Sequence, residues 1–135
     1  MIVIDASVLA AFILKEPGWR NLVKYVKNAV SVDLVFKEVA NVIWKACRIR
    51  KIVDEDQARR LYSILESMRD KNIFLESEDR YLGDALEIAL ENEITVYDAL
   101  YIALAARRKL PLATLDKRQE EVAARLGVKV IRVGV

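Results

Sequence analysis

The chain has 135 residues, of which 54% are hydrophobic and 31% charged; it can therefore fill a globular core and is too apolar for a disordered chain. Its 22 basic and 20 acidic residues give a net charge of +2, which does not indicate a globally basic nucleic-acid-binding protein. The chain has no histidine and one cysteine, Cys47. This excludes a Ser-His-Asp triad, His-ligated zinc, a Cys-based metal cage and an internal disulfide. Its four glycines are not spaced as a phosphate-binding loop.

The first half of the chain alternates short apolar runs with amphipathic segments. Residues 2–4 form a β-branched run typical of a buried parallel strand. Ser7 is expected to cap a short helix that runs to Leu14, and Asp54 to open a long helix. The remaining elements predicted here are a helix at 19–28, a strand at 30–33 and a helix at 35–50.

The second half continues the alternation. Residues 96–108 follow Thr95 and are apolar nearly all round, which predicts a buried helix. The pattern also predicts strands at 73–75, 112–115 and 129–133, and helices at 79–91 and 117–126. Strands that alternate with helices indicate an α/β fold with a mainly parallel sheet, and we expect one domain over residues 1–135.

The opening residues show no features of an export signal. The apolar stretch 1–14 is interrupted by Asp5 and is not preceded by a basic residue. No segment reaches the roughly 20 apolar residues that a membrane-spanning helix needs. Together with the low cysteine content, this predicts a cytoplasmic protein.

Four acidic residues fall at the carboxyl edge of the predicted sheet, where ligands bind in open α/β folds. Asp5 and Asp116 directly follow predicted strands, and Glu38 and Asp98 are expected in the first turns of helices that begin at the same edge. We therefore expect the four carboxylates to lie close together.

Each acid also has a purely structural explanation. Thr95 and Asp98 could form a capping box, Asp116 could cap the helix that follows it, and Asp5 could accept a hydrogen bond from Ser7. The combination is harder to explain in this way, because two carboxylates 4 Å apart repel by about 4 kcal/mol at an effective dielectric of 20. With no histidine available, a hard divalent cation such as Mg²⁺ or Mn²⁺ would offset this repulsion.

These residues resemble the motifs of the PIN-domain ribonucleases, and among them the VapC-like toxins of bacterial and archaeal toxin–antitoxin pairs. The resemblance extends over the whole chain and includes no departure at the acidic positions. The segments that carry it are the D-x-S of residues 5–7, the E-x-x-N of 38–41, the long segment 95–105 and the T-x-D of 114–116.

The resemblance implies a three-layer α/β/α sandwich and a metal-dependent endoribonuclease that uses Mg²⁺ or Mn²⁺ to hydrolyse RNA. It also implies that the protein is the toxin of a toxin–antitoxin pair, with a small cognate antitoxin as partner, and that it forms a homodimer. The residues carried over as catalytic metal ligands are Asp5, Glu38, Asp98 and Asp116. Those expected to support the acids or to contact the scissile phosphate are Ser7, Asn41 and Thr114.

Two other functions are alternatives to this one. A catalytically silent PIN-like module that binds RNA or protein would not need the complete acid set. A phosphoryl-accepting receiver or an aspartyl phosphatase needs an acidic pair or a D-x-D at the first strand end, and Asp5-Ala6-Ser7 supplies neither.

Two basic segments are candidates for a rim that contacts RNA phosphates. Residues 107–135 carry eight basic and three acidic side chains, and residues 45–51 contain four basic side chains. The apolar fraction exceeds the usual 45–50%, which predicts extra surface to bury in a dimer. The interface is expected on the helices predicted at 35–50 and 54–71.

Overall fold

A five-stranded sheet with the order β3-β2-β1-β4-β5 forms the centre of the computed structural model, which describes residues 1–133. All pairings between these strands are parallel, as the alternating pattern predicted. The chain extends the sheet from β1 first to one side and then to the other, so β1 lies at its centre. The strands are β1 (Ile2–Ile4), β2 (Ala29–Val32), β3 (Ile73–Glu76), β4 (Leu112–Thr114) and β5 (Val130–Arg132).

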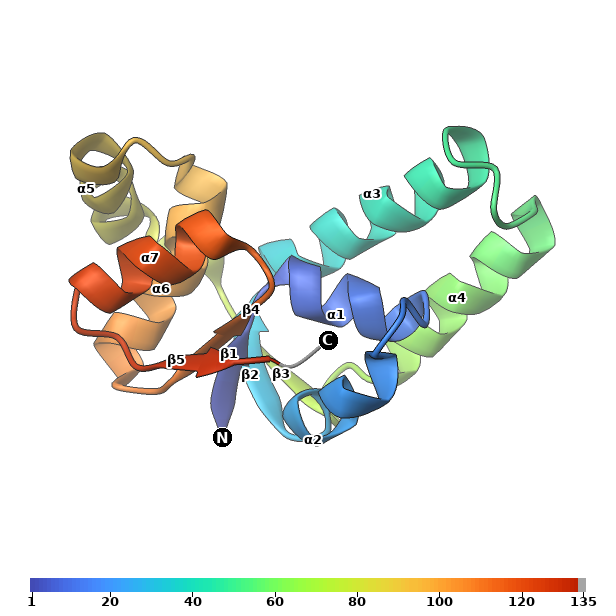
Figure 1. Cartoon of the computed structure of the whole chain (residues 1–135), viewed down its shortest axis with the longest axis horizontal. Coiled ribbons are helices and arrows are strands. Elements are labelled where there is room, and N and C mark those ends of the chain that lie inside the picture. The colour runs from blue at the N-terminus through green and yellow to red at the C-terminus, as the bar shows by residue number, and fades with distance from the viewer. Residues whose placement is uncertain (134–135) are drawn as a thin grey trace.

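Helices cover both faces of the sheet, which gives the expected three layers. Helices α5, α6 and α7 lie on one side, and α1 to α4 lie on the other, where α3 and α4 extend away from the sheet (Figure 1). The helices are α1 (Ala6–Ile13), α2 (Val23–Val26), α3 (Leu34–Arg48), α4 (Glu55–Ser67), α5 (Leu82–Asn92), α6 (Val96–Arg108) and α7 (Lys117–Arg125).

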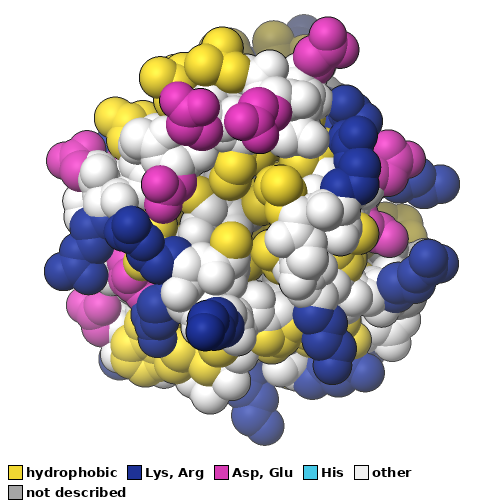
Figure 2. Space-filling model, turned by 90° about the vertical axis from the view of Figure 1, so that its left-hand side faces the viewer, with side chains coloured by type: hydrophobic (Ala, Val, Ile, Leu, Met, Phe, Trp, Pro, Cys, Tyr) yellow, Lys and Arg dark blue, Asp and Glu magenta, His cyan; other side chains and the backbone are white. Residues whose placement is uncertain are grey.

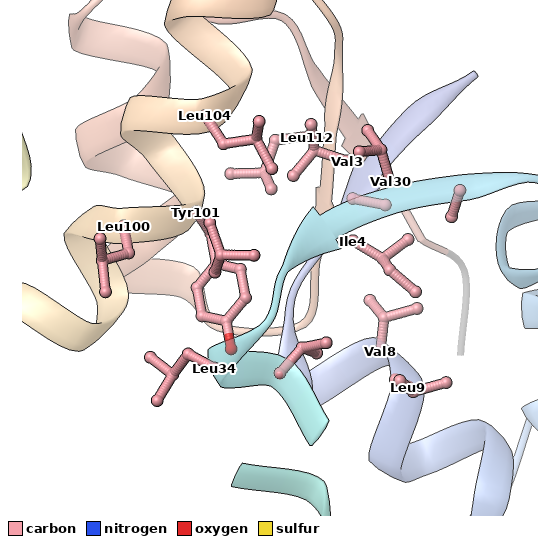
Figure 3. Packing of buried hydrophobic residues seen from close by; sticks show 14 of the residues in the cluster. Val3, Ile4, Val8, Leu9, Val30, Leu34, Leu100, Tyr101, Leu104 and Leu112 are labelled. Atoms are coloured by element: carbon pink, nitrogen blue, oxygen red, sulfur yellow. The ribbon is translucent and has the colours of Figure 1, made fainter. Parts of the chain in front are cut away.

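Helix α6 is buried along its middle, as its apolar sequence predicted. Seven consecutive residues, 99–105, are buried, and the helix contacts β1, β2 and β4. In Figure 3, Leu100, Tyr101 and Leu104 of α6 lie on one side of the sheet, and Val8 and Leu9 of α1 lie on the other. Full burial of one such leucine contributes about 1.5–3 kcal/mol. None of the helices within residues 1–133 has both the length and the apolarity to cross a membrane.

Several helix starts differ from the sequence prediction. Helix α1 is capped by Asp5, whose carboxylate accepts the Val8 amide, so Ser7 lies inside the helix and does not cap it. Because β1 ends at Ile4, the next residue already occupies the cap position. Helix α3 starts at Leu34, which places Glu38 in the second turn and not the first.

Two predicted helices are each interrupted near their beginning. The segment 19–28 consists of a 3₁₀ helix, η1 (Trp19–Leu22), followed by α2, and the segment 79–91 consists of η2 (Glu78–Arg80) followed by α5. Tyr81 separates η2 from α5 and is itself buried, so the chain turns there to place this ring in the core. Helix α4 does begin after Asp54, which forms a capping box with Gln57, but it ends at Ser67 and does not reach residue 71.

Two glycines with open surroundings provide a matched test of backbone conformation. Gly127 ends α7 with a φ of +81°, whereas Gly83 lies inside α5, and a Cβ at either position would meet no atom within 4 Å. Gly127→Ala should lower the free energy of unfolding by roughly 1–2 kcal/mol, because an alanine is strained in the left-handed region.

Gly83→Ala should raise the free energy of unfolding by about 0.5–1 kcal/mol, because alanine favours the helix. Urea denaturation at one fixed protein concentration measures both effects. A shift of the same sign in the two variants would contradict the assigned backbone conformations.

Candidate functional site

Asp5 is a buried carboxylate held on both oxygens at the end of β1. Its side chain is 3% exposed. The Ser7 hydroxyl donates to Oδ1 over 2.6 Å, the Val8 amide donates to the same oxygen over 3.1 Å, and the Thr114 hydroxyl donates to Oδ2. Because β1 and β4 are paired neighbours, Thr114 at the end of β4 lies beside Asp5.

The same two hydroxyls also hold the chain that follows β4. The Leu115 amide donates to Ser7 Oγ over 2.9 Å, and the Asp116 amide donates to Thr114 Oγ1 over 3.0 Å. Ser7 and Thr114 therefore connect Asp5 to the segment that carries Asp116. The Asp116 carboxylate also accepts the amides of the next helix, as the capping explanation anticipated.

Glu38 is joined to the buried helix α6 by a residue that sequence reasoning missed. The Tyr101 hydroxyl donates to Glu38 Oε1, and the Tyr101 ring is 1% exposed. Figure 3 shows the ring pointing from α6 towards the start of α3. Tyr101 follows Asp98 by three residues and so shares its side of the helix, which was the available sequence signal.

Asp98 lies in the first turn of α6, as expected. Its amide donates to the Thr95 hydroxyl over 3.1 Å, which is one half of the anticipated capping box. Asn41 lies one turn after Glu38 on α3 and is exposed. The structure thus brings Asp5, Glu38, Asp98 and Asp116 to the carboxyl edge of the sheet.

Burial and mutual repulsion raise the pKa values of three of these acids. Burial raises the pKa of Asp5 to about 6, with a further contribution from Asp116, against the lowering effect of its hydrogen bonds. Burial also raises the pKa of Glu38, with the Tyr101 hydrogen bond acting against it and the charge of Asp98 adding to it.

Burial also raises the pKa of Asp98, and the charge of Asp116 raises it further. The four carboxylates therefore interact as a series of neighbours, and the described ion pairs provide no Lys or Arg partner for any of them.

This donor set fits a hard divalent cation in its chemistry. All four groups are carboxylates, the ligands that suit Mg²⁺ and Mn²⁺, and their negative charge is not offset by basic side chains within residues 1–133. The fit is incomplete in geometry, because no three acidic side chains in the described part of the chain stand close enough to form a ready-made metal site. Metal binding would therefore require water ligands between the ion and some of the carboxylates, or movement of their side chains.

A groove of about 580 Å³ has Glu38, one of the four acids, in its lining. Ser7 and Glu38 form part of its lining, together with the neighbouring Asn41, and it continues between α1 and α3. The exposed Tyr97, directly before Asp98, also lines it. The acidic edge is thus accessible from an open groove large enough for a small ligand.

The raised pKa of Asp5 predicts a loss of stability with rising pH in protein without bound metal. In the unfolded chain an aspartate titrates near its ordinary value of 3.8, whereas the folded protein holds this proton to about pH 6. Stability should therefore fall between about pH 4 and 6, by about 3 kcal/mol from this residue.

Asp5→Asn should remove that contribution, and the exposed Asp56→Asn serves as the control, because its side chain is 82% exposed. The measurement is urea denaturation at a series of pH values. Parallel pH profiles for wild type and Asp5→Asn would contradict the burial argument.

The comparisons with known proteins agree with this architecture. Residues 2–125 match the family model of the PIN domain. The chain is 36% identical over 125 residues to Ribonuclease VapC3 of Pyrobaculum aerophilum. This match covers 89% of this chain and 92% of that protein. It is 30% identical over 114 residues to Exonuclease VapC9 of the same organism, covering 84% of this chain and 79% of that protein.

Solved structures show the same fold at lower sequence identity. The crystal structure of PAE2754 from Pyrobaculum aerophilum superposes with a TM-score of 0.65 at 23% identity, covering 93% of this chain and 94% of that one. The crystal structure of FitAcB from Neisseria gonorrhoeae superposes with a TM-score of 0.61 at 17% identity. This match covers 98% of this chain and 97% of that one. From the family match and the two VapC relatives, we conclude that this chain belongs to the PIN-domain family, in its VapC-like branch.

Proposed function

We propose that this protein is a metal-dependent endoribonuclease that acts as the toxin of a toxin–antitoxin pair. The observation that carries the proposal is the convergence of four carboxylates, from two strand ends and two helices, at one edge of the sheet, with no ion pair to a basic side chain within residues 1–133. The names of the two relatives, a ribonuclease and an exonuclease, support nuclease activity.

The residues that would hold Mg²⁺ or Mn²⁺ are Asp5, Glu38, Asp98 and Asp116. When bound, such an ion supplies a water molecule of lowered pKa and positive charge facing the scissile phosphate. Everything else in the reaction then depends on how the protein positions these acids and the RNA.

Hydrogen bonds assign positioning roles to the residues around the acids. The Ser7 hydroxyl donates to Asp5 and accepts the Leu115 amide, so it serves to hold the strand ends together. Thr114 anchors the second oxygen of Asp5, and Tyr101 anchors Glu38. Asn41 is exposed in the groove, where its side-chain amide can donate to a phosphate oxygen.

We propose two protein partners, a second copy of the chain and a small antitoxin. Apolar side chains are exposed on the α3–α4 pair, including Trp44 at 53% and Tyr62 at 44%. A second row, Leu82, Leu86 and Leu90, is exposed along α5. Two separate apolar surfaces suit two protein contacts, and the dimer interface expected on α3 and α4 stays a prediction.

The catalytic assignment predicts the loss of RNA cleavage in Asp5→Asn and Asp98→Asn. Each change removes the charge of one proposed metal ligand and alters the side-chain volume little. The assay follows cleavage of circular RNA with Mn²⁺ or Mg²⁺, with and without chelator, because only an endonuclease can cut a circle.

The control is Asp56→Asn, which should cleave like the wild type, and circular dichroism should show that all variants are folded. Full activity in either site variant, or in the presence of chelator, would contradict the metal site. Cleavage restricted to linear RNA would assign exonuclease activity instead.

The oligomeric proposal predicts that the protein sediments as a dimer at micromolar concentration. Trp44→Glu places a charge on the α3–α4 surface and Leu86→Glu places one on the α5 row. The variant that sediments as a monomer identifies the dimer interface, because a buried unpaired charge is unfavourable. A wild-type protein that stays monomeric at high concentration would overturn the proposal.

A further inference from the structure

We propose that the groove between α1 and α3 binds a nucleotide next to the scissile bond of single-stranded RNA, with Lys45 contacting its phosphate and Tyr97 stacking on a base. This inference rests on the proposed ribonuclease activity. It assigns to the groove a ligand class and two specific contacts that the acidic site alone does not define.

The groove begins at Glu38 and runs along two helices, α1 and α3. Glu38 and Lys45 are both on its α3 wall and are seven residues apart, which is two helical turns or about 10 Å. Positions three, four and seven apart share one side of a helix, so α3 lines the groove along this whole length. An RNA strand whose phosphate lies at the acids can continue along this groove. The residues that line it from α3 are Leu34, Lys37, Glu38, Asn41, Val42 and Lys45.

The opposite wall is small and apolar. Ala10 and Ala11 of α1 line the groove and are 7% and 8% exposed, and Leu14 lies at the same end as Lys45. This wall has no charged side chain until Glu16, which is engaged in an ion pair with Arg50 at 2.9 Å. A smooth apolar wall accepts the flat face of any base, because every base has a π-face.

Half of the twelve basic side chains in the two segments that were candidates for RNA contact are engaged in described ion pairs, and Lys45 is not among these. Arg48 and Arg50 pair with Glu55 and Glu16. In residues 107–133, ion pairs engage Arg107, Arg108, Arg118 and Arg132. Figure 2 shows basic and acidic side chains interspersed on the face that carries α5. None of the ion pairs found between residues 1 and 133 involves Lys45, so its charge is available in the groove.

Tyr97 stands where a base would leave the acidic site. It directly precedes Asp98 in the first turn of α6, lines the groove and is 59% exposed. An aromatic ring this exposed beside a proposed phosphodiester site is placed to stack on a base. The chemistry of the groove, one available cation, one aromatic ring and an apolar wall, matches single-stranded RNA.

The test compares Lys45→Ala with Lys71→Ala, a matched exposed lysine in the loop before β3, at the opposite edge of the sheet from the acids. Cleavage of a short labelled single-stranded RNA is measured at several salt concentrations. Lys45→Ala should raise KM with kcat little changed and reduce the slope of log KM against log salt by about 0.7, the value for one phosphate contact on a single strand. Lys71→Ala should change neither.

Substrate length sharpens this comparison. An RNA dinucleotide has only the scissile phosphate, so wild type and Lys45→Ala should cleave it equally. Tyr97→Ala should raise KM for the longer RNA about tenfold, whereas Tyr97→Phe should retain the wild-type value because it keeps the stacking ring. Equal salt slopes for the two lysine variants, or a Tyr97→Phe defect as large as that of Tyr97→Ala, would overturn the proposal.

Direct binding separates this proposal from the proposed activity. Fluorescence anisotropy of the same RNA, in chelator so that no cleavage occurs, should show weaker binding by Lys45→Ala than by Lys71→Ala. That result would support the groove contact even if wild type cut no RNA, an outcome that would refute the ribonuclease proposal alone. Unchanged RNA binding by Lys45→Ala, combined with loss of binding to a small partner protein, would assign the groove to that protein and overturn the inference.

Discussion

The hydrogen bonds between the ends of β1 and β4 hold the centre of this molecule together. Asp5 follows the central strand, and its buried carboxylate accepts hydroxyl groups from Ser7 and Thr114, which in turn accept the amides of Leu115 and Asp116. A buried carboxylate is costly unless its oxygens are hydrogen-bonded. Satisfying Asp5 therefore requires β4 to lie beside β1, and this arrangement places Asp116 at the same edge.

Stability and function oppose one another at this edge. Burial and the neighbouring acids raise the pKa values of Asp5, Glu38 and Asp98, so the ionised site is unfavourable in the protein alone. The rest of the surface is organised differently, with many of its arginines in exposed ion pairs that contribute little individually. Acids with raised pKa values that gather in one place, outside the described ion pairs, are typical of a functional site.

Tyr101 and the buried helix α6 determine where Glu38 and Asp98 lie. The helix is packed against the sheet over seven consecutive residues, so its first turn, which carries Asp98, has little freedom to move. The Tyr101 hydroxyl connects this packed helix to α3 by its hydrogen bond to Glu38. By contrast, the four carboxylates themselves do not form a ready-made metal site within the described residues.

The sequence predicts the order of strands and helices and the buried character of α6, because hydrophobic periodicity is a local property. It also predicts the placement of the four acids, because the carboxyl ends of parallel strands share one edge of the sheet. Three features could not be predicted in this way. The Tyr101–Glu38 hydrogen bond joins residues 63 positions apart, the breaks before α2 and α5 depend on which side chains the core accepts, and the pairing of arginines with acids is decided only when distant surfaces meet. The residue pattern thus determined which acids reach the carboxyl edge of the sheet. Tertiary packing decided which neighbours hold these acids and which basic side chains, Lys45 among them, stay outside the described ion pairs, because such contacts depend on three-dimensional distance and not on spacing along the chain.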